Sequence, residues 1–260
     1  MHVTVVMAVH NGESTVAAAI ESIRRQTYGD WDFMIVDDGS TDGTSDLLEK
    51  EALADKRISV IRNPFNRGLA PSLNIGWQRA RGDVIARMDA DDTSMPERFE
   101  KQVAFLTSHP EIDVLGTAKA AVDSAGRVVG YGYRPEWHDD IAARMYKWNP
   151  FILPSVMMRR RFLIDLGGYD EDERVRRAED CDLWLRGYRR FRYHNLQEPL
   201  IRYRVHYRPS LLSIRGDAFV KLRAAHREGL LLSKGWYAFR SVAGSLLILM
   251  KLRHFRYVAP

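Results

Sequence analysis

A cluster of carboxylates follows a short apolar run in the first half of the chain. The segment Arg87–Asp92 reads Arg-Met-Asp-Ala-Asp-Asp, so three acids occupy four successive positions soon after Val84–Ala86. Like charges held this close repel one another, and a folded protein needs a reason to keep them together. A divalent cation supplies one, because Mg²⁺ or Mn²⁺ prefers carboxylate oxygens and bridges them to substrate phosphates. The alternative is a solvated acidic loop that caps the next helix.

Polar residues follow three other apolar runs in the same way. We expect strands over 3–9, 33–36, 58–61 and 84–88, and helices between them over 17–28, 44–53 and 69–80. This alternation indicates βαβ units and a parallel sheet with helices on both faces. Ligands of such sheets bind beyond the carboxyl ends of the strands. The polar residues expected there are His10-Asn11, Asp37-Asp38, Asn63, Asn66-Arg67 and Asp89–Asp91. Their convergence favours a ligand site over simple solvation.

A second acidic pair, Glu179-Asp180, begins a helical pattern over Ala178–Gly187. Leu183 and Trp184 follow Asp180 at the spacing of one helix face. The same helix can therefore pack on the core and direct Asp180 toward the ligand edge of the sheet.

The other expected elements are less regular. Helices are expected over 97–108, 139–148, 160–166 and 217–232, and strands over 114–117, 127–130, 156–158, 191–195 and 200–203. Residues 123–126 predict a hairpin turn, and residues 204–213 a loop. In the helix over 217–232 we expect Leu222, Ala225 and Leu232 to point inward.

Composition is typical of a globular protein with a substantial core, since 45% of the 260 residues are hydrophobic. The single cysteine, Cys181, excludes an intramolecular disulfide and fits a reducing compartment. We interpret it as a packed thiol. The first residues predict a strand rather than a signal peptide.

Positive charge is concentrated at the end of the chain. Residues 200–260 hold 12 of the 39 Lys/Arg residues and 2 of the 34 Asp/Glu residues, so the remainder is mildly acidic. The apolar run over 236–250 is shorter than the roughly 20 residues that a membrane-spanning helix needs. A basic helical tail fits either an anionic membrane surface or packing on the catalytic domain or a second subunit. No recognised nucleic-acid-binding module accompanies it, and we expect no nucleic-acid partner.

Six short motifs occur in the order seen in family 2 glycosyltransferases. They are Ala8–Glu13, Val36–Asp42, Asn66–Gly68, Asp89–Asp91, Gly167–Tyr169 and Glu179-Asp180. The resemblance covers roughly residues 3–215. It implies an α/β protein with a GT-A fold, a Rossmann-like and mostly parallel sheet flanked by helices. We expect this domain over residues 1–215 and a helical basic C-terminal extension over 216–260.

The resemblance also implies a site for a nucleotide diphospho-sugar, in most members a UDP-sugar. Asp38 matches the acid that accepts a hydrogen bond from the nucleobase. Ala8, His10 and Asn11 match positions near base and ribose, although an aromatic residue often stands where His10 is. Arg67 is placed to meet the base or a phosphate. Glu13 is either part of this site or an acid favoured by a helix N-terminus.

The family resemblance makes Asp89-Ala90-Asp91 the DXD motif. It implies that Asp91 ligates Mn²⁺ or Mg²⁺ most directly, that Asp89 lies near ribose and metal, and that Ala90 lines the nucleotide-sugar site. His206 matches a late loop that closes over metal or diphosphate. Asp92 is expected to support the motif or cap a helix.

The second acidic pair, Glu179-Asp180, is expected to act on the acceptor. Inverting transfer needs one carboxylate that removes the proton of the acceptor hydroxyl, and the resemblance gives this role to Asp180. Glu179, Gly168 and Tyr169 match acceptor-binding positions, and Asp182 is expected to face solvent.

The sequence therefore predicts a metal-dependent inverting glycosyltransferase of cell-surface polysaccharide or glycolipid synthesis. Its partners would be the nucleotide sugar and a glycan or lipid-linked acceptor. We expect a cytoplasmic protein, held at the inner face of the membrane if the tail binds lipid. The alternatives are a polyprenyl-phosphate glycosyltransferase and a nucleotide-sugar-binding protein without catalysis.

Overall fold

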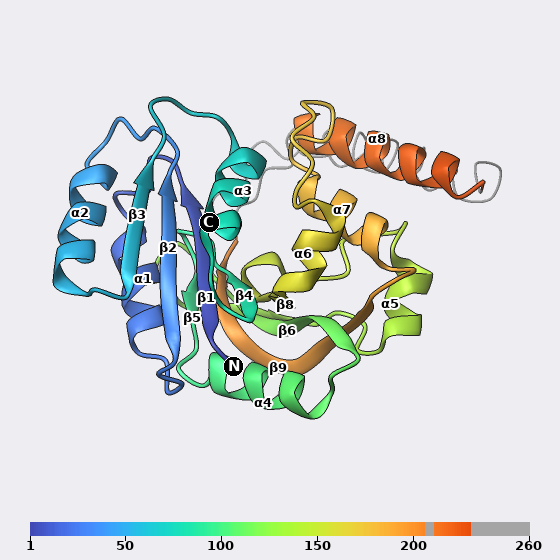
Figure 1. Ribbon diagram of the computed structural model, residues 1–260, viewed down its shortest axis with the longest axis horizontal. Coiled ribbons are helices and arrows are strands. Elements are labelled where there is room, and N and C mark those ends of the chain that lie inside the picture. The colour runs from blue at the N-terminus through green and yellow to red at the C-terminus, as the bar shows by residue number, and fades with distance from the viewer. Residues whose placement is uncertain (206–210, 230–260) are drawn as a thin grey trace, which may run out of the picture.

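The computed structural model describes residues 1–205 and 211–229 (Figure 1). Within these ranges one sheet has the strand order β3-β2-β1-β4-β8-β6-β9-β5, with β7 beside β6. The strands are β1 (Val3–Val9), β2 (Trp31–Asp37), β3 (Ile58–Arg62), β4 (Val84–Arg87), β5 (Thr93–Ser94), β6 (Ile112–Val122), β7 (Val128–Gly132), β8 (Met157–Arg159) and β9 (Arg192–Arg204). The helices are α1 (Val16–Arg24), α2 (Thr44–Ala54), α3 (Leu69–Arg79), α4 (Arg98–Ser108), α5 (His138–Arg144), α6 (Arg160–Leu166), α7 (Glu179–Gly187) and α8 (Leu211–Arg227), with a 3₁₀ turn over Leu153–Ser155.

Strand β1 shows why the sequence forms a sheet with two covered faces. Val3, Val5, Met7 and Val9 belong to one hydrophobic core, and Val6 belongs to the other. Successive side chains of a strand point to opposite faces, so a strand buried on both sides needs a continuous apolar run.

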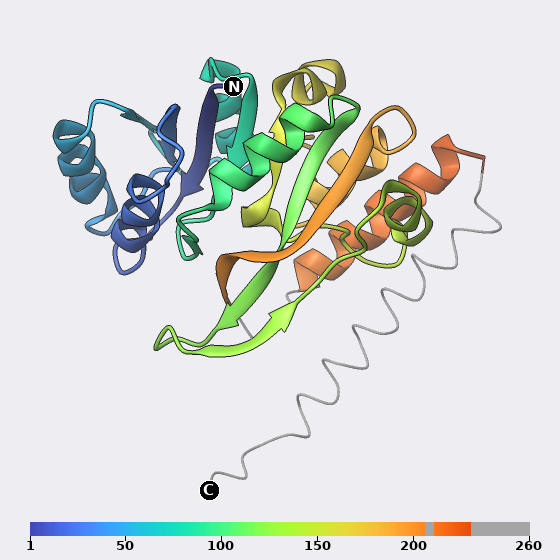
Figure 2. The same ribbon diagram turned by 90° about the horizontal axis from the view of Figure 1, so that it is seen from below.

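Helices cover the two faces of the sheet. Helices α1 and α4 pack into the core that holds Val3 and Val5, and Figure 2 shows α4 lying across the strands. Helices α3, α6 and α7 pack into the core that holds Val6, and α8 lies outside α7 (Figure 1). The Glu179-Asp180 pair is thereby held over the same sheet face as α3.

The parallel part of the sheet confirms the expected βαβ organisation. β3, β2, β1 and β4 pair in parallel. β8 then pairs antiparallel with both β4 and β6, and β6 pairs in parallel with β9. Most paired residues are in parallel strands, as the resemblance implied. The carboxyl ends of β1, β2 and β4 lie together at one edge.

Three expectations about local structure are corrected. The two short strands expected over 191–195 and 200–203 form one strand, β9, because its pairing with β6 is irregular between Thr117 and Ala118 and accommodates Pro199. The short β5 was not expected. Helix α8 begins at Leu211, earlier than expected, and Leu222 is 45% exposed rather than inward, while Val220, Ala224 and Ala225 are buried.

The expected domain boundary at residues 215 and 216 falls inside α8 and stays a prediction. Leu232, the apolar run over 236–250 and the basic residues after it lie outside the described residues. Across residues 1–205 and 211–229, no helix combines the length and apolar character required to cross a bilayer.

Candidate active site

The carboxylate of Asp38 joins the end of β2 to the loop before α3. Its Oδ1 accepts hydrogen bonds from Asn63 Nδ2 and the Arg67 backbone N–H, both at 2.8 Å, and its Oδ2 accepts one from the Gly68 N–H at 2.8 Å. Asp38 is 4% exposed. Because an acceptor oxygen has two lone pairs, Oδ2 retains capacity for one more donor.

The neighbouring Asp37 has a separate role. Its carboxylate accepts hydrogen bonds from the Ser40 backbone N–H at 2.9 Å and from Ser45 Oγ at 2.5 Å. Ser45 lies in the first turn of α2, so Asp37 orders the loop between β2 and that helix. Asp37 therefore has a structural role at the start of α2, whereas Asp38 borders a cavity.

A cavity of about 290 Å³ opens beyond the ends of β1 and β2. Its lining joins the two strand ends, the loop before α3 and the loop before α7: Ala8, Val9, His10, Asp38, Asn66, Gly68, Leu69, Arg176, Arg177 and Glu179. Ala8, His10, Asp38 and Glu179 were expected in the site from sequence, and the structure brings them to one cavity.

His10 lies on this wall with Nδ1 3.0 Å from the carbonyl oxygen of Asp38, a contact that orients the ring. Asn11 has the left-handed φ of 54° and its Oδ1 accepts the Thr41 N–H at 2.8 Å, so it supports the neighbouring loop. Glu13 Oε2 accepts the Gly43 N–H at 3.1 Å. Glu13 therefore lies at the N-terminus of α2, where a negative charge is favourable, and it is not among the residues that line the cavity.

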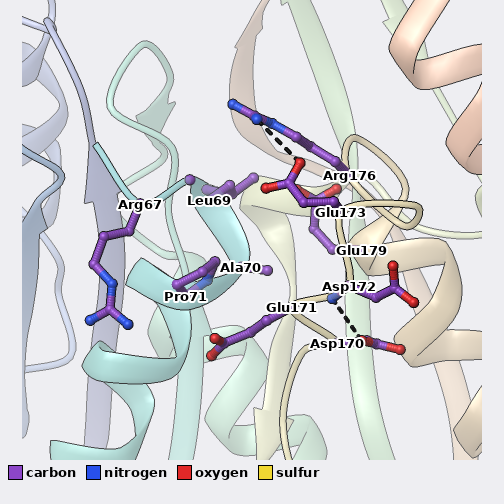
Figure 3. A pocket seen from close by; sticks show the side chains of 11 residues that line it. Arg67, Leu69, Ala70, Pro71, Asp170, Glu171, Asp172, Glu173, Arg176 and Glu179 are labelled. Carbon is purple, nitrogen blue, oxygen red and sulfur yellow. Dashed lines mark hydrogen bonds and ion pairs between the residues drawn. The ribbon is translucent and has the colours of Figure 1, made fainter. Parts of the chain in front are cut away.

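Arg67 contributes its backbone to the site more than its side chain. A smaller pocket adjoins the cavity between the start of α3 and residues 170–173 (Figure 3). In Figure 3 the Arg67 side chain extends away from the acidic side chains of that loop. On the facing wall Arg176 Nη1 lies 3.4 Å from Glu173 Oε2.

The acidic segment after β4 is held by a buried arginine. Arg87 Nη1 donates a hydrogen bond to Asp89 Oδ1 at 2.7 Å, and Arg87 is 3% exposed. Its Nε has no hydrogen-bond partner among the described residues. Burial opposes the charged form of Arg87, but Asp89, Tyr169 and Asp180 together raise its pKa. One cation thus compensates acids from both parts of the site.

Asp92 lies behind this segment. Its Oδ1 accepts the Arg204 backbone N–H at 2.7 Å and the residue is buried, which ties the acidic turn to β9. Burial, together with the charges of Asp89 and Asp91, raises the pKa of Asp92 to about 8. Asp92 supports the turn, whereas Asp89 and Asp91 are only half-buried.

Asp89 and Asp91 fit a divalent cation whose other ligands come from the substrate and from water. Among residues 1–205 and 211–229, no group of three His, Cys, Asp or Glu side chains is arranged to hold a metal alone. Mg²⁺ in nucleotide sites is commonly bound by one or two carboxylates, with phosphates and water completing its shell. Asp89 and Asp91, close enough to raise the pKa of Asp92, match that donor set. His206 lies outside the described residues.

Asp180 is a buried carboxylic acid in the first turn of α7. It is 7% exposed, and its Oδ1 has no hydrogen-bond partner among the described residues. Burial raises the pKa of Asp180 to about 7; the charge of Arg87 opposes this rise, and those of Glu179 and Asp89 add to it. Burial also raises the pKa of Glu179, which lines the cavity. A carboxyl poised near neutral pH suits proton transfer.

Gly168 and Tyr169 are fixed against α3. Asn74 Oδ1 accepts the Tyr169 N–H at 2.9 Å, and Asn74 Nδ2 donates to the Tyr169 carbonyl at 2.9 Å. Gly168 has a φ of 77°, and a Cβ there would lie 2.6 Å from Asn74 Oδ1. Burial raises the pKa of the Tyr169 hydroxyl; the charge of Arg87 opposes this rise, and the charge of Asp180 adds to it. The Tyr169 ring therefore lies near both charged residues.

Asp182 was expected to face solvent, but it is buried. It is 2% exposed and forms ion pairs with Arg186 at 2.6 Å and Arg223 at 2.5 Å. The prediction was wrong because α8 supplies Arg223 on the outer side of α7, a contact with no signal in the local sequence. Cys181, as expected, is a buried thiol, and burial raises its pKa.

Sequence reasoning missed Arg176 and Arg177 on the cavity wall. Arg177 adopts a φ of 70°, which is strained for a residue other than glycine. The signal was present in the sequence, because both arginines directly precede the Glu179-Asp180 helix. The role of Arg87 was also missed, although a charge at the end of an apolar strand is unusual.

The family of the chain follows from comparison with known proteins. A family model described as Glycosyl transferase family 2 matches residues 4–167. The chain is 43% identical over 204 residues to the putative glycosyltransferase EpsE of Bacillus subtilis (strain 168), covering 78% of this chain and 72% of that protein. It is 29% identical over 208 residues to the O-antigen biosynthesis glycosyltransferase WbnJ of Escherichia coli, covering 78% and 80%.

A solved structure shares the fold. The crystal structure of S. aureus TarS 1-349 in complex with UDP-GlcNAc matches with a TM-score of 0.70 and 19% sequence identity, covering 95% of this chain and 72% of that one. The chain belongs to glycosyl transferase family 2, and its sheet and helices form the GT-A fold.

Proposed function

We propose that this protein is an inverting glycosyltransferase that moves a sugar from a UDP-sugar to a hydroxyl group. The acceptor would be a glycan or lipid-linked glycan of cell-surface polysaccharide synthesis. The relative WbnJ, named as an O-antigen biosynthesis glycosyltransferase, supports this setting. The observation that carries the mechanism is the buried Asp180 carboxyl, without a hydrogen-bond partner for Oδ1 among the described residues and with its pKa raised to about 7.

Donor binding would use the cavity beyond β1 and β2. Asp38 Oδ2 accepts one backbone N–H and has a lone pair left for a ring N–H of the base. His10, fixed on the Asp38 carbonyl, would lie against base or ribose. UDP as the nucleotide agrees with the UDP-GlcNAc in the TarS structure, which has the same fold.

The leaving diphosphate would lie at the acidic turn. Asp91 and Asp89 would hold Mn²⁺ or Mg²⁺ there, and the ion would supply positive charge for the departing nucleotide. Arg87 keeps Asp89 oriented through the 2.7 Å hydrogen bond. Arg177, on the wall beside Glu179, brings a further positive charge to the cavity.

Proton transfer would fall to Asp180. Its ionised carboxylate would take the proton of the acceptor hydroxyl as that oxygen attacks the anomeric carbon. Glu179 and Tyr169, one beside Asp180 in sequence and the other near its charge, would orient the acceptor. A phosphate acceptor would need no such base, so a poised carboxyl favours a hydroxyl acceptor.

The proposal extends to the organisation of the chain. Residues 1–215 would form the catalytic domain, and the basic extension over 216–260 would contact the inner face of the cell membrane from the cytoplasm. Binding to vesicles with and without anionic lipid, compared between the full chain and a variant with neutral residues at Lys251, Arg253 and Arg256, tests this contact.

Calorimetric titration of UDP, GDP and CDP, with and without Mn²⁺, tests the donor assignment. UDP is expected to bind tightest and to need the metal. Asp38→Ala should weaken UDP binding, and Asp46→Asn, an exposed acid on α2, should leave it unchanged. Tighter binding of another nucleotide would overturn the assignment of UDP as the donor nucleotide. If none of the three nucleotides bound, the proposal that the protein is a glycosyltransferase would be overturned.

A further inference from the structure

Three hydrogen-bond donors gather on the side of the acidic turn away from the nucleotide cavity. Lys119 on β6 directs its Nζ over the ring of Tyr203 on β9, 3.6 Å from the ring centre. The lysine stem lies against Gly132 of β7, where an added Cβ would be 2.9 Å from Lys119 Cε. The ammonium group is therefore held in place by strands on both sides.

Arg134 is the second cation of this group. Its Nε donates to the Asn149 carbonyl at 3.1 Å and its Nη1 to the Tyr133 carbonyl at 3.1 Å. These backbone bonds fix the guanidinium without neutralising it. Among residues 1–205 and 211–229, neither Lys119 nor Arg134 has an ion pair with a carboxylate, although both residues are half-buried.

The charge of Arg134 acts on Lys119. Burial lowers the pKa of Lys119, the charge of Arg134 lowers it further, and Asp92 opposes both. Burial likewise lowers the pKa of Arg134, and the interaction with Tyr203 opposes this decrease. Half-buried like charges are unfavourable unless an anion joins them.

Tyr203 supplies a neutral donor beside the cations. Burial and the charges of Asp92, Asp89 and Asp91 raise the pKa of its hydroxyl to about 12, so it keeps its proton. Within the described part of the chain, this hydroxyl has no hydrogen-bond partner. An ammonium, a guanidinium and a hydroxyl thus offer unused donors next to the acidic turn.

The strand order indicates which substrate this group serves. The nucleotide cavity is lined from β1, β2 and the loop before α3. β6 and β9 lie on the other side of β4 in the sheet. The acidic turn after β4 therefore lies between the nucleotide cavity and the group of donors on β6 and β9.

We propose that Lys119, Arg134 and Tyr203 form an anion-binding site that holds a phosphate or carboxylate group of the acceptor. The identification of the ligand as an acceptor rests on the proposed function, whereas the anion site itself rests on the three donors. The acceptor would then be an acidic glycan or a phosphorylated one, held so that a neighbouring hydroxyl faces Asp180.

Titration of the full chain with inorganic phosphate and with glucuronate, by NMR in the presence of saturating UDP and Mg²⁺, tests the site. UDP occupies the nucleotide cavity, so the added anion reports on other sites. Lys119→Gln and Arg134→Gln should each weaken binding of the preferred anion about tenfold, and Tyr203→Phe about threefold. Lys119→Arg should retain most of the affinity, and Lys50→Gln, an exposed lysine on α2, should match the wild type.

Tighter binding of phosphate than of glucuronate would identify a phosphorylated acceptor, and tighter binding of glucuronate would identify an acceptor with an acidic sugar. Both results support the site. Unchanged anion affinity in both Gln variants would overturn the site. If the same variants also lost affinity for UDP, the two cations would belong to the nucleotide-sugar site instead. UDP affinity measured on the same samples separates this result from failure of the proposed function, in which the wild type would not bind UDP.

Discussion

Arg87 Nη1 lies 2.7 Å from Asp89 Oδ1, and the charge of the same buried guanidinium opposes the rise that burial causes in the pKa of Asp180. The first acid belongs to the turn that would hold the leaving group, and the second begins α7 more than ninety residues later. One cation at the end of β4 therefore links the two halves of the site. Its positive charge offsets the negative charges of the half-buried Asp89 and the buried Asp180.

Replacing Arg87 should change the pH dependence of catalysis. Without its charge the pKa of Asp180 rises, so less of the carboxylate is ionised at neutral pH and the acidic limb of the kcat profile moves upward by about 1 pH unit or more in Arg87→Met. Arg87→Lys keeps a charge and should move the limb less. An unchanged limb in Arg87→Met would show that the two groups are not coupled.

Asp180→Asn and Asp182→Asn should separate catalysis from stability. Loss of the base should lower kcat about 10²–10⁴-fold in Asp180→Asn while UDP still binds. Asp182→Asn breaks the ion pairs with Arg186 and Arg223 and should lower the melting temperature. Steady-state kinetics and thermal unfolding of both variants check this contrast, and equal turnover in Asp180→Asn and wild type would remove Asp180 as the base.

The raised pKa of Asp180 also predicts a pH dependence of stability. The folded state favours the protonated carboxyl, because the pKa rises from 3.8 to about 7. This contribution is complete below about pH 4 and is lost as the pH rises through 7. Asparagine does not ionise, so Asp180→Asn should gain stability relative to wild type between pH 5 and pH 8. A constant difference in urea unfolding across this range would contradict the assignment.

Gly168→Ala should disturb the site through Tyr169. The new Cβ would meet Asn74 Oδ1 at 2.6 Å in a backbone with a φ of 77°, at a cost of about 1–3 kcal/mol. Gly167→Ala is the matched control, since Gly167 has a φ of 72° but nothing lies within 4 Å of its added Cβ. Gly168→Ala should lose more stability than the control in urea unfolding. Equal losses would show that backbone strain alone matters.

Much of this architecture could be predicted from local sequence. The continuous apolar runs predicted β1, β2, β3 and β4 nearly at their observed bounds, and the parallel pairing of β2, β1 and β4 places their polar carboxyl ends at one edge of the sheet. Glu179 and Asp180 were placed correctly at the start of a core-packed helix because Leu183 and Trp184 mark its buried face.

What could not be predicted depends on distant partners. Asp182 is buried only because α8 returns Arg223 to it. The continuity of β9 depends on an irregular pairing with β6, whereas the local sequence predicted two short strands over 191–195 and 200–203. The group of Lys119, Arg134 and Tyr203 comes from three separate segments with no shared motif.

The stereochemistry of the product tests the central claim most directly. The full chain would be incubated with an α-linked UDP-sugar and Mn²⁺, and the anomeric proton of the transferred or released sugar followed by NMR before it equilibrates. Inverting transfer with Asp180 as base predicts that the β-anomer forms first and that Asp180→Asn forms it far more slowly. Initial formation of the α-anomer, or no consumption of any UDP-sugar, would contradict the account.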